Sequence, residues 1–173
     1  MDMKAFAVAL ALAASGAAFC GRVPIDARFV QNGERAVRGW TFNEVKGYEP
    51  FGDVNAVMLD GLAGVRLTSK GKPTTIYMKE AIHVKTGNVC ILRASARGKG
   101  KGRGAMGFFA YGERWAWKGS HGATVTPAEG LDTQPVAVEA RFTVPEGVET
   151  VRPTLTVPPG SDVEYFDVTL DIE

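Results

Sequence analysis

The stretch CILRASARGKGKGRGAMGFFAYGERWAW, residues 90–117, carries the strongest structural signal in the chain. Over residues 90–97, small and apolar side chains alternate with more polar ones, which is the period of two expected of a β-strand. Residues 97–104 alternate basic side chains with glycine and offer little to pack, so they are predicted to be a turn. A second strand is predicted over residues 105–111.

The end of this stretch is rich in aromatic side chains. The chain turns near Gly112 and resumes as a short strand predicted over residues 114–118. In a regular strand Trp115 and Trp117 point to the same face, because side chains two residues apart share a face. Two interpretations of the pair remain open: an exposed aromatic platform beside Tyr111, or two indoles that cover the core.

The rest of the chain shows the same short period, cut by turn signals such as Asn32-Gly33, Asp60-Gly61 and Thr86-Gly87. Past residue 18 no segment has sustained helical periodicity. Many short strands with frequent turns predict an all-β fold, an antiparallel β-sandwich or barrel. The candidate strands are residues 25–30, 39–42, 56–59, 65–69, 74–84, 88–97, 105–111, 114–118, 123–126, 135–144, 151–157 and 163–172.

Two of these strands carry further detail. Glu80 interrupts the apolar face of residues 74–84, which predicts a bend or bulge where a long strand leaves one sheet. Residues 163–172 alternate so regularly that the last strand is predicted to pair inside a sheet, with Phe166, Val168 and Leu170 among its inward side chains.

Size and charge narrow the function classes. The chain has 173 residues, enough for one sizeable core, and residues 19–173 are predicted to form a single β-sandwich domain. It contains 20 Lys and Arg against 19 Asp and Glu. This near-balance argues against a nucleic-acid binder, which would carry a broad basic excess.

The N-terminus has the pattern of a secretory signal peptide over residues 1–18. Lys4 precedes a short apolar run, small residues follow, and cleavage is predicted near Ala18. The run is too short to span a membrane as a helix. These features predict a secreted, periplasmic or cell-envelope protein. The alternative is a lipoprotein acylated at Cys20, to which Phe19 is a poor fit.

Cys20 and Cys90 are the two cysteines of the chain, and both would remain after cleavage near Ala18. Export permits a disulfide between them, if the mature N-terminus lies against the strand that holds Cys90. The other interpretation is a small buried thiol at Cys90 and an unpaired Cys20.

Signals for catalysis are weak. Gly119-Ser120-His121-Gly122 lacks the pattern and the strand–turn–helix context of a nucleophile elbow. The basic glycine-rich turn lacks the ending of a phosphate-binding loop, and no cluster of His, Cys and carboxylates has metal-ligand spacing. Paired carboxylates for glycoside cleavage meet only in space. The candidates for such a pair, each of which also reads as an ordinary turn or strand carboxylate, are Asp53, Asp60, Glu80 and Glu113.

The order of several short motifs resembles the carbohydrate-binding modules of the galactose-binding-like jelly-roll type, in particular the group appended to xylanases and other glucanases. The resemblance covers roughly residues 29–172, and Cys90 stands where that group usually has an aromatic residue. The motifs are Gln31-Asn32-Gly33, Gly39-Trp40-Thr41, the hairpin of residues 57–68, Ile82 to Gly87, Cys90 to Arg97, Phe142-Thr143-Val144-Pro145, Arg152-Pro153-Thr154-Leu155 and Phe166-Asp167-Val168-Thr169-Leu170.

The resemblance implies an all-β jelly-roll sandwich in an exported bacterial protein that binds polysaccharide or oligosaccharide without cleaving it. Such modules often hold a structural calcium between an early acidic residue and a late aspartate. Asp167 matches the late aspartate, and Glu34 loosely matches the early residue. Trp40 lies in the Gly-Trp motif and is expected in the core.

Combined with the residues themselves, the resemblance assigns sugar stacking to Trp115, Trp117 and Tyr111, and hydrogen bonding to Arg114 and Arg97. The basic turn of residues 97–104 either binds an acidic polysaccharide or is a solvated loop. Two other functions stay open: an envelope or surface protein that uses the sandwich for protein contacts, and a small polysaccharide lyase or glycoside hydrolase.

Overall fold

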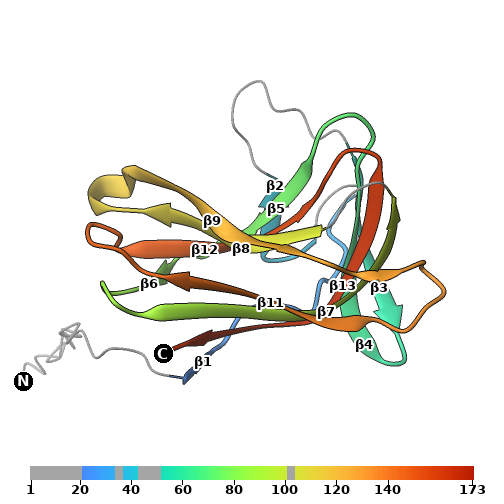
Figure 1. The fold of residues 1–173 in the computed structure, drawn as a ribbon, viewed down its shortest axis with the longest axis horizontal. Helices are drawn as coiled ribbons and strands as arrows, with labels where there is room; N and C mark the ends of the chain where they lie inside the picture. The colour runs from blue at the N-terminus through green and yellow to red at the C-terminus, as the bar shows by residue number, and fades with distance from the viewer. Residues whose placement is uncertain (1–20, 34–36, 43–51, 101–103) are drawn as a thin grey trace, which may run out of the picture.

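The described chain folds as two β-sheets packed face to face (Figure 1). The computed structural model describes residues 21–33, 37–42, 52–100 and 104–173. Sheet I has seven strands in the order β10-β7-β13-β4-β3, with β11 also beside β7 and β1 beside β13. Its strands are β1 (Gly21–Val23), β3 (Val54–Leu59), β4 (Leu62–Thr68), β7 (Val89–Gly100), β10 (Ala128–Glu129), β11 (Val136–Thr143) and β13 (Ser161–Ile172).

Sheet II has six strands in the order β2-β5-β12-β8-β9, with β6 also beside β12. Every strand pair is antiparallel except β10 with β7. The predicted antiparallel β-sandwich of jelly-roll type is confirmed. The strands of sheet II are β2 (Trp40–Phe42), β5 (Thr74–Met78), β6 (Ile82–His83), β8 (Gly104–Tyr111), β9 (Trp117–Val125) and β12 (Thr150–Val157).

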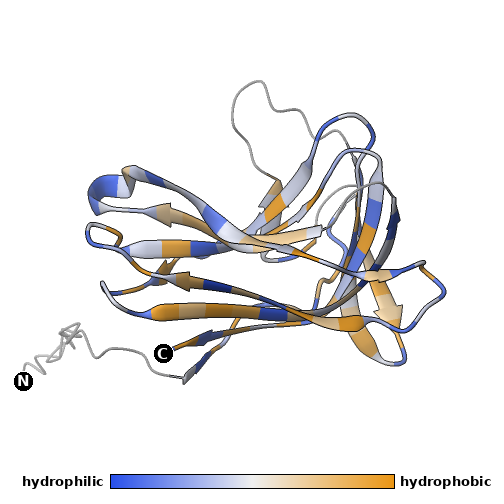
Figure 2. Cartoon of the chain, in the orientation of Figure 1, coloured by the Kyte–Doolittle hydropathy of each residue, from blue (hydrophilic) through white to orange (hydrophobic). Residues whose placement is uncertain are grey.

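The core lies between the sheets, and Figure 2 shows hydrophobic residues recurring along the strands of both layers. Trp40 is fully buried, as expected, with its ring 5.5 Å from that of Phe29 and its indole N–H donating to the Asp26 carbonyl at 2.8 Å. The buried Tyr165 hydroxyl of sheet I donates to the Thr156 carbonyl of sheet II at 2.9 Å. This bond satisfies a polar group in the core and ties the two layers together.

The basic glycine-rich segment is not a hairpin turn. β7 continues to Gly100 in sheet I and the next strand, β8, lies in sheet II, so the segment crosses between layers. Two of its glycines serve close strand packing. A Cβ on Gly98 would lie 2.5 Å from the Asp162 carbonyl oxygen, and one on Gly100 would lie 2.6 Å from the Cα of Ser161. Residues 101–103 lie outside the described chain.

The strand predicted over residues 74–84 is interrupted, but it does not change sheet. β5 ends at Met78, β6 begins at Ile82, and both pair with β12. The Glu80 signal therefore marked a break within one sheet.

The last strand is paired inside sheet I, between β7 and β4, as predicted. Its inward set is different from the predicted one, because a register shift between Phe166 and Thr169 breaks the alternation at Asp167, which has φ 47°. Val163 and Tyr165 face the core before this bulge, and Val168 and Leu170 face it afterwards. Phe166 is buried on the outer side of the sheet, under the Arg97 guanidinium.

Candidate functional site

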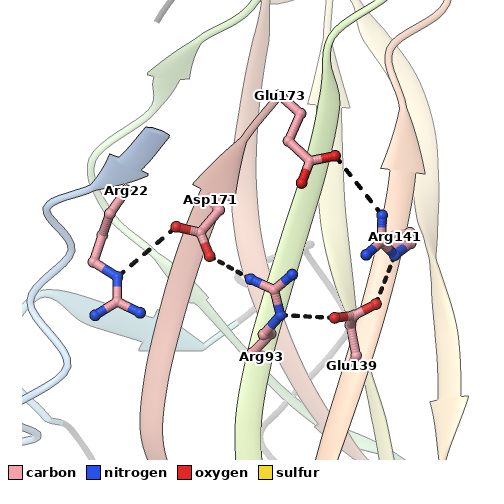
Figure 3. Close-up of polar contacts among 6 residues, drawn as sticks. All are labelled: Arg22, Arg93, Glu139, Arg141, Asp171 and Glu173. Atoms are coloured by element: carbon pink, nitrogen blue, oxygen red, sulfur yellow. Dashed lines mark hydrogen bonds and ion pairs between the residues drawn. The ribbon is translucent and has the colours of Figure 1, made fainter. Parts of the chain in front are cut away.

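The outer face of sheet I is covered by paired charges (Figure 3). Arg93 of β7 donates to Glu139 of β11 at 2.7 Å and also pairs with Asp171 of β13. Arg141 donates to Glu139 at 2.6 Å, and Arg22 continues the chain of ion pairs to Asp171 at 3.8 Å. Since these groups satisfy one another, this face offers few free charges to a ligand.

The outer face of sheet II carries an aromatic cluster instead, defined as Tyr77, Phe109, Tyr111, Trp115 and Trp117. The ring centroid of Tyr77 of β5 lies 5.5 Å from that of Phe109 of β8, and the Phe109 centroid lies 5.4 Å from that of Trp117. Tyr111 lies 5.5 Å from Trp115 and 5.4 Å from Trp117, edge to face in both cases. The two tryptophans are 57% and 56% exposed. Exposed rings held at these spacings form a rigid, largely apolar contact surface.

A β-bulge turns Trp117 to this outer face. Ala110 pairs with Gly119, but the next residue of β8, Tyr111, pairs with Trp117, so Lys118 is the extra residue. In an unbroken ladder Lys118 would stand opposite Tyr111 and Trp117 would point to the other side of the sheet. The insertion reverses the alternation and brings the indole against Tyr111.

Trp115 reaches the same face by a different route. It ends a 3₁₀ turn, Glu113–Trp115, rather than lying in the strand predicted over residues 114–118. Arg114 and Trp115 have φ values of 53° and 64°, a left-handed backbone that costs about 1–2 kcal/mol for each non-glycine residue. The two indoles share a face, as expected, but a turn and a bulge place them there and not a regular strand.

Arg152 of β12 lies beneath the aromatic cluster. Its guanidinium carbon is 5.0 Å from the Trp115 ring centroid, 5.5 Å from that of Tyr77 and 5.7 Å from that of Tyr111. Burial raises the pKa of the Tyr111 phenol above its ordinary value, and the nearby Arg152 cation opposes part of this shift. The three rings therefore hold a cation on an otherwise apolar surface.

A shallow hollow of about 200 Å³ continues the face along β8 and β9, away from the tryptophans. Gly107 and Gly122 stand opposite each other in its floor. A Cβ on Gly107 would lie 2.1 Å from the His121 carbonyl oxygen, so the floor cannot carry larger side chains without moving a strand. Hydroxyl groups on its sides come from Ser120, Thr124, Thr154 and Thr156.

The other predicted ligand-binding residues fall outside the aromatic cluster. Arg114 adjoins it on the 3₁₀ turn, where its side chain is 91% exposed and pairs with Glu113 at 3.5 Å. Arg97 lies in sheet I, donates to Glu164 at 2.7 Å and to the Thr133 carbonyl at 3.0 Å, and is only 13% exposed. It therefore does not come together with Trp115 and Trp117.

Tyr77, Phe109 and Arg152 also belong to the site, although they were not predicted as ligand-binding residues. Arg152 lies in the Arg152-Pro153-Thr154-Leu155 motif of the fold, and the inward Val151 and Leu155 of the same strand imply an outward arginine by alternation. Tyr77 could have been found by the same alternation, because Ile76 and Met78 face the core. Phe109 gave no comparable signal, because two adjacent phenylalanines in β8 leave open which one faces outward.

Candidates for metal binding and catalysis do not gather in the described part of the chain. There, no group of three His, Cys, Asp or Glu side chains is arranged to hold a metal ion. Asp167 is exposed at the β13 bulge, and its expected partner Glu34 lies outside the described residues, so the calcium prediction stays a prediction. The four candidate carboxylates lie near separate turns: Asp53 before β3, Asp60 between β3 and β4, Glu80 between β5 and β6, and Glu113 before β9.

Cys90 is fully buried in the core, and burial raises the pKa of its thiol to about 12. The registers place Gly21 and Cys90 on opposite sides of Ile172, with β13 between β1 and β7. Cys20 and the predicted signal peptide lie outside the described residues.

Comparison with known proteins bears on the fold. No protein-family model and no curated protein matches the sequence. Among solved structures, the CBM22-1 xylan-binding domain of Paenibacillus barcinonensis superposes with a TM-score of 0.55 at 11% identity, over 90% of this chain and 97% of that domain. The chain has the fold of a carbohydrate-binding module. The resemblance drawn from the motifs is thereby confirmed at the level of the fold.

Two longer proteins contain the same fold as one part. The endo-1,4-β-D-xylanase 10B of Clostridium thermocellum, its CBM22-1 and GH10 modules complexed with xylohexaose, gives a TM-score of 0.56 at 15% identity over 86% of this chain. The enzymatically active domain of tailspike protein 4 from bacteriophage CBA120 gives 0.59 at 12% identity over 85%. This chain spans only 28% and 22% of their respective lengths.

Proposed function

We propose that this chain binds polysaccharide or oligosaccharide, without cleaving it, on the outer face of sheet II. The observation that carries the proposal is the pair of exposed indoles, Trp115 and Trp117, held against Tyr111 on the same sheet face as a shallow hollow. Sugar rings present C–H faces that stack on aromatic side chains, and rigid aromatics give contact area at low entropic cost.

The face is long enough for a chain of several sugars. From Tyr111 to Ala105, β8 runs for about 20 Å at roughly 3.3 Å per residue. The tryptophans occupy one end, and the floor of Gly107 and Gly122 occupies the other. Threonine and serine hydroxyls beside that floor supply hydrogen bonds to sugar hydroxyls, and Arg114 at the rim supplies a further donor.

Export is part of the proposal, with residues 1–18 as a signal peptide and residues 19–173 as one binding domain. The sequence pattern at Lys4 to Ala18 supports it. In the part of the chain with described structure, no helix has the length and apolar character needed to cross a membrane.

The first test is electrophoresis of the folded protein in gels that contain one soluble polysaccharide each, from xylans, β-glucans, galactans and polyuronates. Retardation by at least one polymer is expected, and the double substitution Trp115→Ala and Trp117→Ala should remove it. The matched control is Met58→Ala, which deletes another exposed apolar side chain, 68% accessible, next to the β3–β4 turn.

The result has three informative outcomes. Migration unchanged in every gel, or retardation that survives the double substitution, overturns the proposed site. Copurification of a specific envelope protein that depends on Trp115 favours a protein-contact function, because exposed tryptophans also anchor protein interfaces. Release of reducing or unsaturated sugar ends favours an enzyme.

A further inference from the structure

Arg152 differs from the other described arginines because it has no carboxylate partner. Among the arginines that the structure describes, eight have a carboxylate within ion-pair distance, and Arg152 has none. The eight are Arg22, Arg28, Arg38, Arg66, Arg93, Arg97, Arg114 and Arg141. The Nε of Arg152 is buried and has no hydrogen-bond partner.

The surroundings of Arg152 make this uncompensated charge costly. The side chain is half-buried among Tyr77, Tyr111 and Trp115, whose rings hold its guanidinium carbon at 5.0–5.7 Å. Contact with ring faces attracts a cation, but it neither neutralises the charge nor accepts the N–H groups in the guanidinium plane. A charge that loses solvent without gaining an anion lowers stability.

Among the residues that the structure describes, the sheet around Arg152 supplies no anion. The outward positions of β5, β8 and β12 are otherwise threonine, alanine, glycine or aromatic, so Arg152 is their one charged side chain. Glu113, on the neighbouring turn, is paired with Arg114. In the described chain, Nε is the one nitrogen of the Arg152 guanidinium that is buried without a partner. The two terminal nitrogens are open to solvent beside the stacking surface.

We propose that the ligand of this face is an acidic sugar, one whose ring carries a carboxylate, as a hexuronic acid does. This inference rests on the proposed carbohydrate-binding function and names its ligand class. The sugar ring stacks on the exposed indoles, and its carboxylate pairs with Arg152. A planar guanidinium matches a planar carboxylate through two parallel N–H···O bonds, and a partly desolvated site strengthens the pair.

A neutral hydroxyl fits this position less well. It would accept one N–H but would leave the cation without a counter-charge. The other role for Arg152 is internal, a spacer that holds the three rings apart by cation–π contact. The two roles differ in one measurable respect, because only ion pairing makes the affinity depend on the charge of the ligand.

The test therefore compares polygalacturonate with its methyl-esterified form, which has the same sugar backbone but lacks the charge. Affinities are measured by gel retardation and by titration calorimetry at two salt concentrations. The unsubstituted protein is expected to bind the acid form about 10- to 100-fold more tightly, the range for a charge-assisted bidentate contact, with the difference shrinking at high salt. An alginate and a neutral xylan serve as second probes of each class.

Two substitutions separate ion pairing from ring support. Arg152→Met should abolish the preference for the acid form. Arg152→Lys keeps the charge but not the planar guanidinium with its two parallel N–H donors, so it should keep part of the preference. Arg141→Met removes a 54% exposed cation from sheet I and should leave the preference for the acid form unchanged. Lys99→Gln controls for attraction of polyanions by the glycine-rich segment. Thermal melting monitors folding of each variant.

The outcomes distinguish this inference from the proposed function. If no polymer binds, the proposed function fails and this inference fails with it. Equal affinity for the acid, the ester and xylan, lost on Trp115→Ala, leaves the proposed function standing and overturns the acidic-sugar assignment. A preference for the acid that survives Arg152→Met but disappears with Lys99→Gln also overturns it. Since the acid–ester comparison needs no variant, misfolding of one would not leave the question open.

Discussion

Trp117 stands directly opposite Tyr111 in the β8–β9 ladder, although the neighbouring pair, Ala110 with Gly119, sets a register that would put Lys118 there. One inserted residue therefore converts a charged position into an aromatic one, with ring centroids 5.4 Å apart. Bulges re-aim side chains in this way beside functional sites. The aromatic cluster depends on that local irregularity and on the left-handed turn before it.

Deleting Lys118 should remove the bulge and leave Trp117 opposite Tyr111, because Trp117 would then directly precede Gly119 in the register that Ala110 and Gly119 set. We expect polysaccharide retardation and the exposed tryptophan emission to be retained, because both indoles would stay on the outer face of sheet II. A near-ultraviolet circular dichroism signal confirms that the variant is folded. Loss of binding by a folded deletion variant would contradict the role of Lys118 as the extra residue of the bulge.

Gly112→Ala should disturb the turn that presents Trp115. An added Cβ would lie 2.4 Å from the Gly147 carbonyl oxygen, a backbone atom that cannot move alone. We expect a stability loss of about 1–3 kcal/mol in urea unfolding, the usual cost of overpacking. Gly71→Ala is the control, since nothing lies within 4 Å of the added atom and its φ is not positive. Equal stability of the two variants would refute the packing argument.

Two of the three tryptophans should respond to a collisional quencher. Trp115 and Trp117 are more than half exposed, and Trp40 is 0% exposed. Acrylamide should therefore quench most of the emission in the native protein, and the Trp115→Ala, Trp117→Ala double variant should be protected. Addition of a bound oligosaccharide should protect the native protein in the same way. Strong quenching of the double variant would show that Trp40 is accessible, contrary to the structure.

Acid should weaken the ion-pair chain of sheet I. Hydrogen bonds from Arg141 and then Arg93 hold the pKa of Glu139 below its ordinary value of 4.5. A carboxyl group with a lowered folded-state pKa stabilises the fold fully above the unfolded pKa, and that contribution is lost as pH falls through the folded value. Unfolding free energy should thus fall as pH drops below about 4.5.

Glu139→Gln should make the unfolding free energy fall less steeply at acid pH, as measured by urea titrations at several pH values. The effect is small, because the pair is solvent-exposed and screened. Glu146→Gln is the control, as Glu146 is an exposed turn carboxylate without an ion pair in the described structure. If the unfolding free energy falls equally steeply at acid pH in Glu139→Gln and in the unsubstituted protein, the stabilising role of the Glu139 ion pairs is contradicted.

Cys90 should be inert in the native state. Its thiol is buried in the core, and a pKa of about 12 leaves almost no thiolate at pH 8. In a Cys20→Ser background, a thiol reagent should label nothing until denaturant is added and one thiol per chain afterwards. Rapid native labelling would contradict the burial. The unsubstituted mature protein, denatured without reductant, reports two thiols if Cys20 and Cys90 are free and none if they form a disulfide.

Much of the fold was readable because alternation is a local property. The strands at residues 90–97, 151–157 and 163–172 were predicted from side-chain period alone, and the turn pairs between strands limited the fold to a sandwich or barrel. Sheet membership was not readable. Residues 97–104 were predicted to be a turn, but β7 continues to Gly100, where Gly98 and Gly100 pack closely on β13, and β8 lies in the other sheet.

The candidate site, like the fold, was predictable from the sequence only in part. The sequence by itself determined that aromatic side chains crowd residues 111–117, and that Trp40 belongs to the core. Only the tertiary structure decided that Tyr77, from β5, and Arg152, from β12, join those aromatics, because strand order in sheet II sets β12 between β5 and β8. It also decided that Arg97 does not, since Arg97 lies on β7 in the other sheet, where it pairs with Glu164. Alternation along a strand follows from backbone geometry alone, whereas neighbours across a sheet are selected by the packing of the whole chain.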